Sequence, residues 1–193
     1  MRVCVVGTGQ IGATLGRAMA EAGHEVVFGS RHPSTEQALL LGTTASVRAV
    51  SEALEGADAV VVAVPGPSVA DFAEEHRAAL AGALIVDAAN TMGAAVGNHA
   101  EAFGPGARYA RAFNSLGVEN FVDPGYPDGP ADLFFSAPAA DRQTVAELIE
   151  AVGLHPVYTG EDPTIVDGIF RLWVALVMGQ GHSRHSALRL IGR

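Results

Sequence analysis

Residues 3–12 read VCVVGTGQIG, a short β-branched run that leads directly into three glycines with the spacing G-x-G-x-x-G. Residues 13–22 carry a helical pattern, Gly23 ends it, and residues 25–28 form a second run rich in β-branched and aromatic side chains. The order strand, glycine-rich turn, helix, strand therefore predicts the opening unit of an open α/β fold.

The three glycines have separate mechanical roles in such a unit. Gly7 permits the tight turn, Gly9 lets a pyrophosphate approach the backbone, and Gly12 lets the helix pack close to the strand. Free N–H groups at the helix N-terminus then face the anion. Because the turn lies directly between a strand and a helix, we interpret it as a dinucleotide-binding site; the alternative is a purely structural turn.

The end of the second strand indicates which dinucleotide binds. An NAD site usually places Asp or Glu there to accept from the ribose hydroxyl, whereas the extra phosphate of NADP needs donors and positive charge. This chain has Ser30 and Arg31 at that place, and Thr8 in the turn is within reach of the same phosphate. We therefore expect NADP(H) rather than NAD; the alternative is that Arg31 is a solvated loop residue.

The composition indicates one sizeable globular domain. The chain has 193 residues, of which 49% are apolar and 17% charged, enough to bury a proper core. Its formal net charge of −9 argues against nucleic acid or an anionic membrane as a partner. Local donors must then hold an anionic cofactor.

Residue types further limit the compartment and the chemistry. Cys4 is the only cysteine and falls in the first strand, so we expect a buried thiol in a cytoplasmic protein. The first strand begins too soon after Met1 for a signal peptide, and no apolar run reaches the length of a membrane span. All 12 basic residues are arginine, which excludes mechanisms based on a catalytic or phosphate-binding lysine.

The remainder of the chain alternates apolar runs with helical patterns, which predicts a doubly wound parallel sheet, the NAD(P)-binding Rossmann fold. Residues 94–103 are ambiguous, and residues 123–130 (DPGYPDGP) predict a long loop whose role as a lid is left open. The further strands are expected at 43–47, 58–64, 83–89, 109–113, 133–136 and 155–158, and the further helices at 35–41, 48–54, 68–80 and 141–152, the last capped by Asp141.

The pattern changes near residue 164, where one long and almost entirely apolar helix begins. Residues 165–178 leave hardly any polar face, so the helix needs cover on more than one side. We therefore predict a homodimer with this helix in the interface; the alternative is a helix packed wholly on its own domain. The expected organisation is a dinucleotide-binding domain over residues 1–160 and a C-terminal helical segment over residues 161–193.

Ligands of open parallel sheets sit at the carboxyl ends of the strands. Pro65 there is suited to wall a nicotinamide ring, and Asn90 and Asn114 are suited to orient a carboxamide or ring carbonyl, unless they are ordinary strand-end residues. The full set of expected cofactor-binding residues is Gly7, Thr8, Gly9, Gln10, Ile11, Gly12, Ser30, Arg31, Val64, Pro65, Asn90 and Asn114.

Other chemistry has little support in the sequence. His182 and His185 stand three apart in an expected helical segment but lack an accompanying carboxylate or thiol, so no metal site is expected. There is no G-x-S-x-G elbow of a serine hydrolase. We expect a structural role for Asp87 and a solvated or structural one for His76, and we assign no catalytic residue. Hydride transfer between two stacked rings needs close approach and exclusion of water more than proton relay.

Several motifs together resemble one known family. They are GTGQIG, GSR after the second strand, AVP and DAAN after later strands, RAFNSLGVENF, and the closing pattern LWVALVMGQG with ALRLIGR. Over essentially the whole chain these are similar to the NADPH-dependent coenzyme F420 reductase family, also described as F420-dependent NADP oxidoreductases and predicted dinucleotide-binding oxidoreductases.

This resemblance implies a Rossmann fold, NADP(H) bound through Thr8, Ser30 and Arg31, and hydride exchange with a stacked deazaflavin. Family members with that substrate carry a further basic residue near the position of Thr35, and they differ at residues 111–114. The acceptor therefore stays open between coenzyme F420 and a flavin or another small molecule. The alternative function is a non-catalytic NADP(H)-binding module that senses the redox state of the cofactor.

Overall fold

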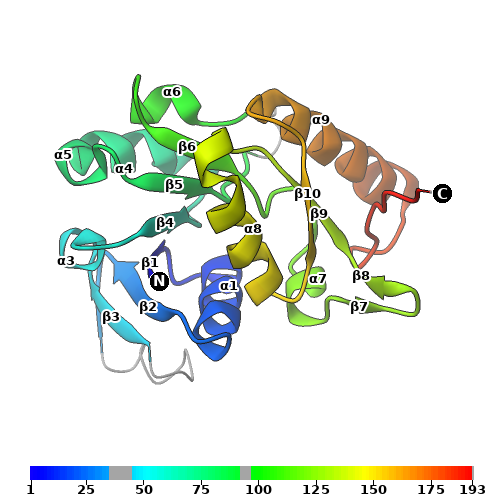
Figure 1. Ribbon diagram of the computed structural model, residues 1–193, viewed down its shortest axis with the longest axis horizontal. Coiled ribbons are helices and arrows are strands. Elements are labelled where there is room, and N and C mark those ends of the chain that lie inside the picture. Colours follow the sequence, from blue (N-terminus) through cyan, green and yellow to red (C-terminus); the bar gives the residue numbers. More distant parts are fainter. Residues whose placement is uncertain (35–44, 92–96, 193) are drawn as a thin grey trace.

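The centre of the molecule is a six-stranded parallel sheet with the strand order β3-β2-β1-β4-β5-β6 (Figure 1). The computed structural model describes residues 1–34, 45–91 and 97–192. Strand β1 (Arg2–Val6) lies between β2 (Glu25–Ser30) and β4 (Ala59–Val62). The strand order therefore reverses beside β1, which confirms the predicted doubly wound Rossmann fold and places its switch point at the glycine-rich turn.

Helices follow most of the strands of the central sheet along the chain. The sheet is completed by β3 (Ser46–Ala49), β5 (Leu84–Asp87) and β6 (Arg108–Arg111). The helices are α1 (Gln10–Glu21), α3 (Val50–Leu54), α4 (Val69–Glu75), α5 (Arg77–Leu80), α6 (Ala100–Phe103), α7 (Glu119–Val122), α8 (Arg142–Ala151) and α9 (Pro163–Val174), with short 3-10 turns at Gly66–Ser68 and Ala139–Asp141.

The alternation of side chains along the strands divides the interior into two cores. Val3 and Val5 face α1 and α8 on one side of the sheet, whereas Cys4 and Val6 face α3, α4 and α5 on the other (Figure 1). Cys4 is fully buried, as expected of a small core residue. The continuous apolar runs read from the sequence are thus strands covered on both faces.

Two small sheets lie outside the central one. Strands β9 (Asp132–Phe135) and β10 (His155–Tyr158) pair with each other in parallel, and an antiparallel bridge between Arg111 and Ser136 joins β9 to the end of β6. The expected loop at 123–130 is instead a short antiparallel hairpin of β7 (Gly125–Tyr126) and β8 (Gly129–Pro130). The prediction of a loop was wrong because Pro127-Asp128 followed by Gly129, whose φ is 112°, makes a tight hairpin turn.

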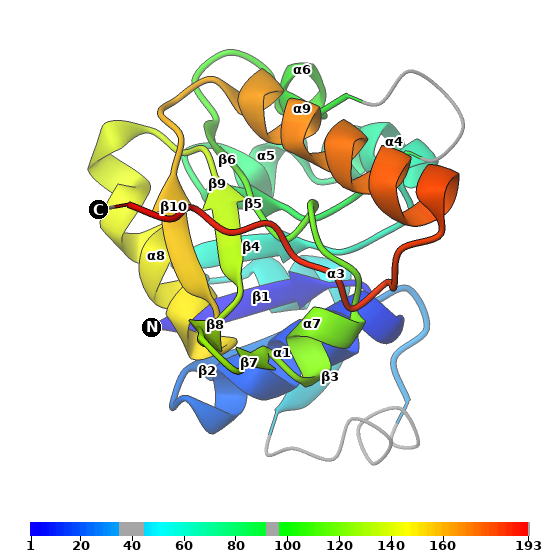
Figure 2. The same cartoon turned by 90° about the vertical axis from the view of Figure 1, so that its right-hand side faces the viewer.

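Helix α9 crosses the molecule above the sheet in Figure 2, and the C-terminal segment runs back below α9. A π-helical turn, Ala175–Gly179, extends the helix. Trp173 donates its indole N–H to the carbonyl of Ser186, and the backbone N–H of Leu190 donates to Asp132, so the segment is anchored at both ends. No helix in the described ranges is long and apolar enough to cross a membrane.

Several boundaries differ from the sequence-based expectations. Strand β3 runs on to residue 49, where a helix was expected from residue 48, and the helix expected at 68–80 is divided at His76. Asp141 takes the position before α8, but its carboxylate binds the Arg108 guanidinium instead of making a cap hydrogen bond to a described residue. The helix expected at 35–41, and parts of the segments expected at 43–47 and 94–103, lie outside the described residues.

Candidate functional site

The carboxyl ends of β1, β2 and β4 surround a cavity of about 540 Å³. It lies at the reversal in strand order, which is where open parallel sheets bind ligands. Its lining consists of Val6, Gly7, Thr8, Gly9, Gly29, Ser30, Arg31, His32, Val50, Ala63, Val64, Pro65, Ser68, Asp71, Phe72, Glu75 and His76. Of the expected cofactor-binding residues, the structure brings Gly7, Thr8, Gly9, Ser30, Arg31, Val64 and Pro65 together there.

The geometry of the glycine-rich turn gives each glycine a distinct environment. Gly7 has a φ of 108°, and a Cβ there would lie 2.5 Å from the carbonyl oxygen of Ala63 at the end of β4. A Cβ on Gly12 would lie 2.1 Å from the carbonyl oxygen of Gly7, so the helix packs directly on the turn. A Cβ on Gly9 would meet nothing within 4 Å, since this position opens into the cavity. The turn is closed on two sides and accessible on the third.

The N-terminus of α1 points its unpaired backbone donors toward this open side. Gly9 occupies the cap position with an extended backbone, and its carbonyl accepts the first helical hydrogen bond, from Ala13, at 2.8 Å. The first turn of α1 carries no acidic side chain that would compete with an anionic ligand for these N–H groups. The partial positive charge of the helix is therefore available to a ligand.

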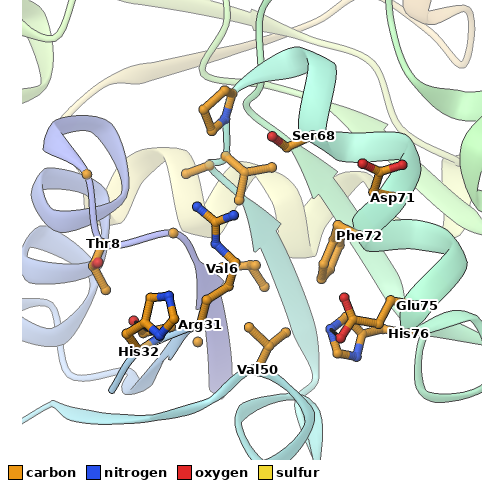
Figure 3. Close-up of a pocket in the computed structure, with 17 residues that line it drawn as sticks. Val6, Thr8, Arg31, His32, Val50, Ser68, Asp71, Phe72, Glu75 and His76 are labelled. Atoms are coloured by element: carbon orange, nitrogen blue, oxygen red, sulfur yellow. Dashed lines mark hydrogen bonds and ion pairs between the residues drawn. The ribbon is translucent and has the colours of Figure 1, made fainter. Parts of the chain in front are cut away.

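Polar and cationic side chains follow β2 on the same side of the cavity. Figure 3 shows Arg31 reaching into the cavity, with Thr8 and His32 nearby. The Ser30 hydroxyl accepts the backbone N–H of His32 at 3.2 Å, which fixes the turn after the strand. His32 was not expected to belong to the site, although it follows Arg31 directly in the sequence. The cavity thus combines a helix N-terminus with a guanidinium and an imidazole.

The opposite wall comes from α4 and was not foreseen from the sequence. Asp71, Phe72, Glu75 and His76 line the cavity across from Arg31 (Figure 3). Asp71, Glu75 and His76 therefore add ionisable groups to the cavity besides Arg31. His76 is not a solvated surface residue, because its side chain is only 12% exposed and its ring lies 5.3 Å from that of Phe72. The sequence signal for this contact was the spacing of four residues between Phe72 and His76, which places two side chains on the same face of a helix.

The other expected cofactor-binding residues lie next to this cavity, outside its lining. Gln10, Ile11 and Gly12 form the first turn of α1, where backbone N–H groups, not side chains, are available. Asn90 donates its side-chain amide to the carbonyl of Asn114 at 3.0 Å, and Asn114 donates to the carbonyl of Ala89 at 3.2 Å. The two asparagines thus join the turns that follow β5 and β6. Their contact with a cofactor stays a prediction.

A buried arginine, Arg111, organises that same edge of the sheet. The last residue of β6, it has no exposed surface. Its guanidinium donates to Asp87 of β5 at 2.9 Å, to Asp167 of α9 at 3.0 Å and to Asn90 at 3.2 Å. One buried cation therefore ties two strand ends to the C-terminal helix. No local sequence signal indicates this role, since its acidic partners are 24 and 56 residues away.

Asp87 is fully buried and accepts hydrogen bonds from several donors. One carboxylate oxygen accepts from Arg111, from Tyr109 at 2.6 Å and from His99 at 2.8 Å. Burial alone raises the pKa of Asp87, but the hydrogen bond from His99, the charge of Arg111 and the hydroxyl of Tyr109 together hold that pKa below its ordinary value. Burial and the neighbouring Asp87 carboxylate raise the pKa of Tyr109. Asp87 is therefore ionised and its tyrosine partner is neutral.

The turn after β6 is strained. Phe113 has a φ of 65°, and it is the only residue other than glycine with a positive φ in the described part of the chain. The turn places Asn114 and Ser115 in the interior, where Asn114 Oδ1 and Ser115 Oγ have no hydrogen-bond partner among the described residues. Backbone strain and orphaned polar atoms of this kind are concentrated at functional sites.

The histidines considered for a metal do not form a site. His182 and His185 lie beyond the end of the helical segment, contrary to the expected helix, and His185 Nε2 contacts the carbonyl oxygen of Asp123 at 2.7 Å. Over residues 1–34, 45–91 and 97–192, no group of three or more His, Cys, Asp or Glu side chains is arranged to hold a metal ion.

Comparison with known proteins gives the family of the N-terminal half. Residues 2–91 match the family described as NADP oxidoreductase, coenzyme F420-dependent. This segment includes the glycine-rich turn, Ser30, Arg31, Val64, Pro65 and Asn90. The match confirms the resemblance inferred from the motifs.

Solved structures extend the similarity over the whole chain. A candidate F420-dependent NADP-reductase from Arthrobacter sp. FB24 is 26% identical, with a TM-score of 0.75 over 93% of this chain and 94% of that one. A hypothetical protein from Sinorhizobium meliloti is 28% identical, with a TM-score of 0.69 over 83% of this chain and 85% of that one. Pyrroline carboxylate reductase from Plasmodium falciparum with NADP bound, at 15% identity and a TM-score of 0.63 over 95% of this chain and 71% of that one, shares the fold.

These similarities support an NADP-dependent oxidoreductase. Residues 2–91 are similar in sequence to the NADP oxidoreductase, coenzyme F420-dependent family.

Proposed function

We propose that this protein binds NADP(H) in the cavity at the carboxyl ends of β1, β2 and β4 and exchanges hydride with a flat acceptor of the deazaflavin or flavin type. The observation that carries the proposal is the joint placement of an open helix N-terminus and Arg31 in one cavity. In this assignment residues 1–160 are the dinucleotide-binding domain, and residues 161–193 are a helical segment that completes the fold.

Each part of the cofactor has a chemically matched place. The backbone N–H groups of Gly9 and of residues 10–12 suit the diphosphate. Ser30 and Arg31, with Thr8 and His32, suit the phosphate on the adenosine ribose, because they offer donors and positive charge. Val64 and Pro65 lead from the cavity toward the ends of β5 and β6, where Asn90 and Asn114 lie. NADP(H) supplies a hydride at its nicotinamide ring when bound.

The acceptor is proposed from the family description and from the name of the Arthrobacter relative, both of which refer to coenzyme F420. A flavin is the alternative because it presents a similar flat ring system. Both acceptors require face-to-face approach to the nicotinamide.

Replacing Arg31 tests the cofactor assignment. Arg31→Glu should weaken NADPH binding by about 1 to 3 kcal/mol, the scale of a charge-assisted hydrogen bond, and should change NADH binding much less. Calorimetric titration of both cofactors measures the difference. Arg142→Glu, on α8 at the far face of the sheet, is the matched control and should bind both cofactors as the wild type does. Equal losses for NADPH and NADH in Arg31→Glu would contradict the assignment.

Absorbance near 340 nm tests the reaction itself. NADPH is mixed with the protein and with oxidised coenzyme F420 or FMN, and acceptor-dependent loss of absorbance is expected with one of them. A protein that binds NADPH but reduces neither acceptor would instead be a redox sensor, or would act on a different substrate.

We also propose that α9 forms a homodimer. Val166, Phe170, Trp173 and Val177 face the interior, but Ile165, Leu172 and Met178 are 48%, 49% and 60% exposed. Ile165 and Leu172 share one side of the helix with the half-buried Ile169 and Leu176, so an apolar stripe at helical spacing faces outward. A second copy of the same helix matches this stripe, because a twofold interface brings identical surfaces together.

Light scattering after gel filtration measures the assembly. The wild type should have twice the 19.8 kDa mass of one chain, and Leu172→Glu should be monomeric. Val122→Glu, at an apolar position that is 70% exposed on α7, should remain dimeric. A wild type that elutes as a monomer at micromolar concentration would refute the dimer.

A further inference from the structure

His99 is a partly buried imidazole beside β5 and β6, and its hydrogen bonds fix its orientation. It directly precedes α6, and its side chain is 15% exposed. Its Nδ1 lies 2.8 Å from Asp87, and its backbone N–H donates to the Tyr109 hydroxyl at 3.1 Å. Because the ionised Asp87 carboxylate only accepts hydrogen bonds, Nδ1 must carry a proton. The other ring nitrogen, Nε2, is then directed away from the carboxylate and toward Thr91.

Nε2 faces a hydroxyl at the carboxyl edge of the sheet. Thr91 Oγ1 lies 3.5 Å from Nε2, a separation at the outer limit of a hydrogen bond. Catalytic hydrogen bonds are often this long before ligands bind. Thr91 packs closely on the turn after β4, since a Cβ on Gly66 would lie 2.2 Å from its hydroxyl oxygen. Pro65, the neighbour of Gly66, lines the cavity. The order carboxylate, imidazole, hydroxyl therefore leads from the interior to the turn after β4, which adjoins the cavity.

The charges around the imidazole favour a proton-carrying role. Asp87 and Asp167 are two buried carboxylates around a single buried guanidinium, that of Arg111. A proton on His99 brings the net charge of this cluster to zero. Ionisable side chains from three elements lie near His99: Asp87 of β5, Tyr109 and Arg111 of β6 and, through Asn98, Asp167 of α9. Helix α4 packs on α6 through Phe72 and Phe103. Asp71 and Glu75 of α4, and His76 after it, lie in the cavity wall.

We infer that His99, oriented by Asp87, supplies through the Thr91 hydroxyl the proton that accompanies the hydride. The inference rests on the proposed function. Reduction of a flavin or deazaflavin by NADPH adds one hydride and one proton to the acceptor, and NADPH leaves as NADP⁺. In the relay, Thr91 gives its hydroxyl proton to a ring nitrogen of the acceptor and takes the Nε2 proton of His99. Solvent restores the Nε2 proton, and Nδ1 keeps its own proton on Asp87 throughout.

Two pairs of substitutions separate this role from a structural one. His99→Asn keeps an amide donor near Asp87 but removes the titrating nitrogen. Thr91→Val removes the hydroxyl, and Thr91→Ser restores it. The control is His155→Asn, because His155 also holds an aspartate, Asp132, at 2.8 Å through Nδ1, but lies on β10 outside the cavity lining.

Turnover is followed with NADPH and oxidised coenzyme F420 or FMN between pH 5 and 9. Wild-type turnover should fall on the alkaline side, because the relay takes up one proton from solvent in each cycle. His99→Asn should be about 10²-fold slower at neutral pH, within the range for a general acid, and should lose the alkaline fall. Its NADPH affinity, measured by calorimetry, should not change. Thr91→Val should resemble His99→Asn, whereas Thr91→Ser and His155→Asn should behave as the wild type does.

Nitrogen-15 spectra of the histidine rings provide a readout that does not depend on turnover. The neutral ring of His99 should carry its proton on Nδ1, and Thr91→Val should shift the signal of Nε2. A neutral ring with its proton on Nε2 would overturn the orientation on which the relay depends.

The outcomes distinguish the relay from the proposed function. If the wild type turns over and His99→Asn keeps both its rate and its pH profile, the relay is wrong and the function stands. If the wild type binds NADPH but reduces neither acceptor, the proposed function fails and the relay fails with it. If His99→Asn melts early, the Thr91→Val and Thr91→Ser pair decides, and equal rates for the two refute the relay.

Discussion

The buried guanidinium of Arg111 gives the most quantitative test of how the fold supports the site. Arg111→Met keeps most of the aliphatic volume and removes every hydrogen bond of the guanidinium. Asp87 and Asp167, which are 0% and 2% exposed, would then share the interior with no cation between them. Asp87 would retain Tyr109, His99 and one backbone donor, but Asp167 would retain only Asn98 as a side-chain donor among the described residues.

The expected cost follows from this imbalance. Removing one partner of a buried ion pair costs about 3 to 5 kcal/mol, because the remaining charge is buried and uncompensated. For a chain of this length each kcal/mol lowers the melting temperature by about 2 to 4 °C, so a fall of roughly 6 to 20 °C is expected. A surface pair supplies the comparison. Arg77 and Glu74 are 58% and 73% exposed, and Arg77→Met should cost about 1 kcal/mol or less.

The pH dependence provides a second check. In the wild type the pKa of Asp87 is lowered, so its contribution to stability is present above the unfolded pKa and is lost as the pH falls through the folded one. In Arg111→Met the Asp87 carboxylate loses the charge of Arg111, one of the causes that lower its pKa, so this contribution becomes smaller. The difference between the two proteins should therefore narrow toward acid pH.

Urea unfolding at several pH values, with circular dichroism as the signal, measures both effects. A loss below about 1 kcal/mol that does not vary with pH would refute the account of a charge cluster that needs its guanidinium.

Further predictions concern the glycine-rich turn and the cysteine. Gly12→Ala should destabilise the fold and weaken NADPH binding, since its Cβ would lie 2.1 Å from the carbonyl oxygen of Gly7. Gly9→Ala should melt as the wild type does but bind NADPH less tightly, because its Cβ enters open space beside the diphosphate; equal melting losses in the two variants would contradict this distinction. Burial raises the pKa of the Cys4 thiol to about 12, so a thiol-disulfide reagent at pH 8 should react with none of the native protein and with one thiol after unfolding. Rapid reaction of the native protein would show that the first strand is accessible.

The central sheet was predictable because its signals are local. The apolar runs that end before Gly7, before Pro65 and at Asp87 correspond to β1, β4 and β5, which are covered on both faces. The glycine spacing indicated where the strand order reverses. The pairing of the later strands was not predictable in this way. Residues 133–136 and 155–158 read as strands, but nothing in either run indicates that they pair with each other outside the main sheet.

The site was predicted where it depends on backbone geometry and was missed where it depends on distant contacts. Ser30 and Arg31 follow a strand whose position was clear, so their place in the cavity could be inferred. The α4 wall with His76 depends on how that helix is rotated against the sheet. The linkage of Arg111 to Asp87 and Asp167 joins residues far apart in the chain. A charged residue inside a motif gives no sign by itself that it is buried.

Calorimetric titration of the wild-type protein with NADPH and with NADH tests the central claim most directly. If the tip of α1 holds the diphosphate and Arg31 holds the additional phosphate, NADPH should bind at least about tenfold more tightly than NADH, a difference of about 1.4 kcal/mol. The account is contradicted if neither nucleotide binds at millimolar concentration, or if both bind equally well.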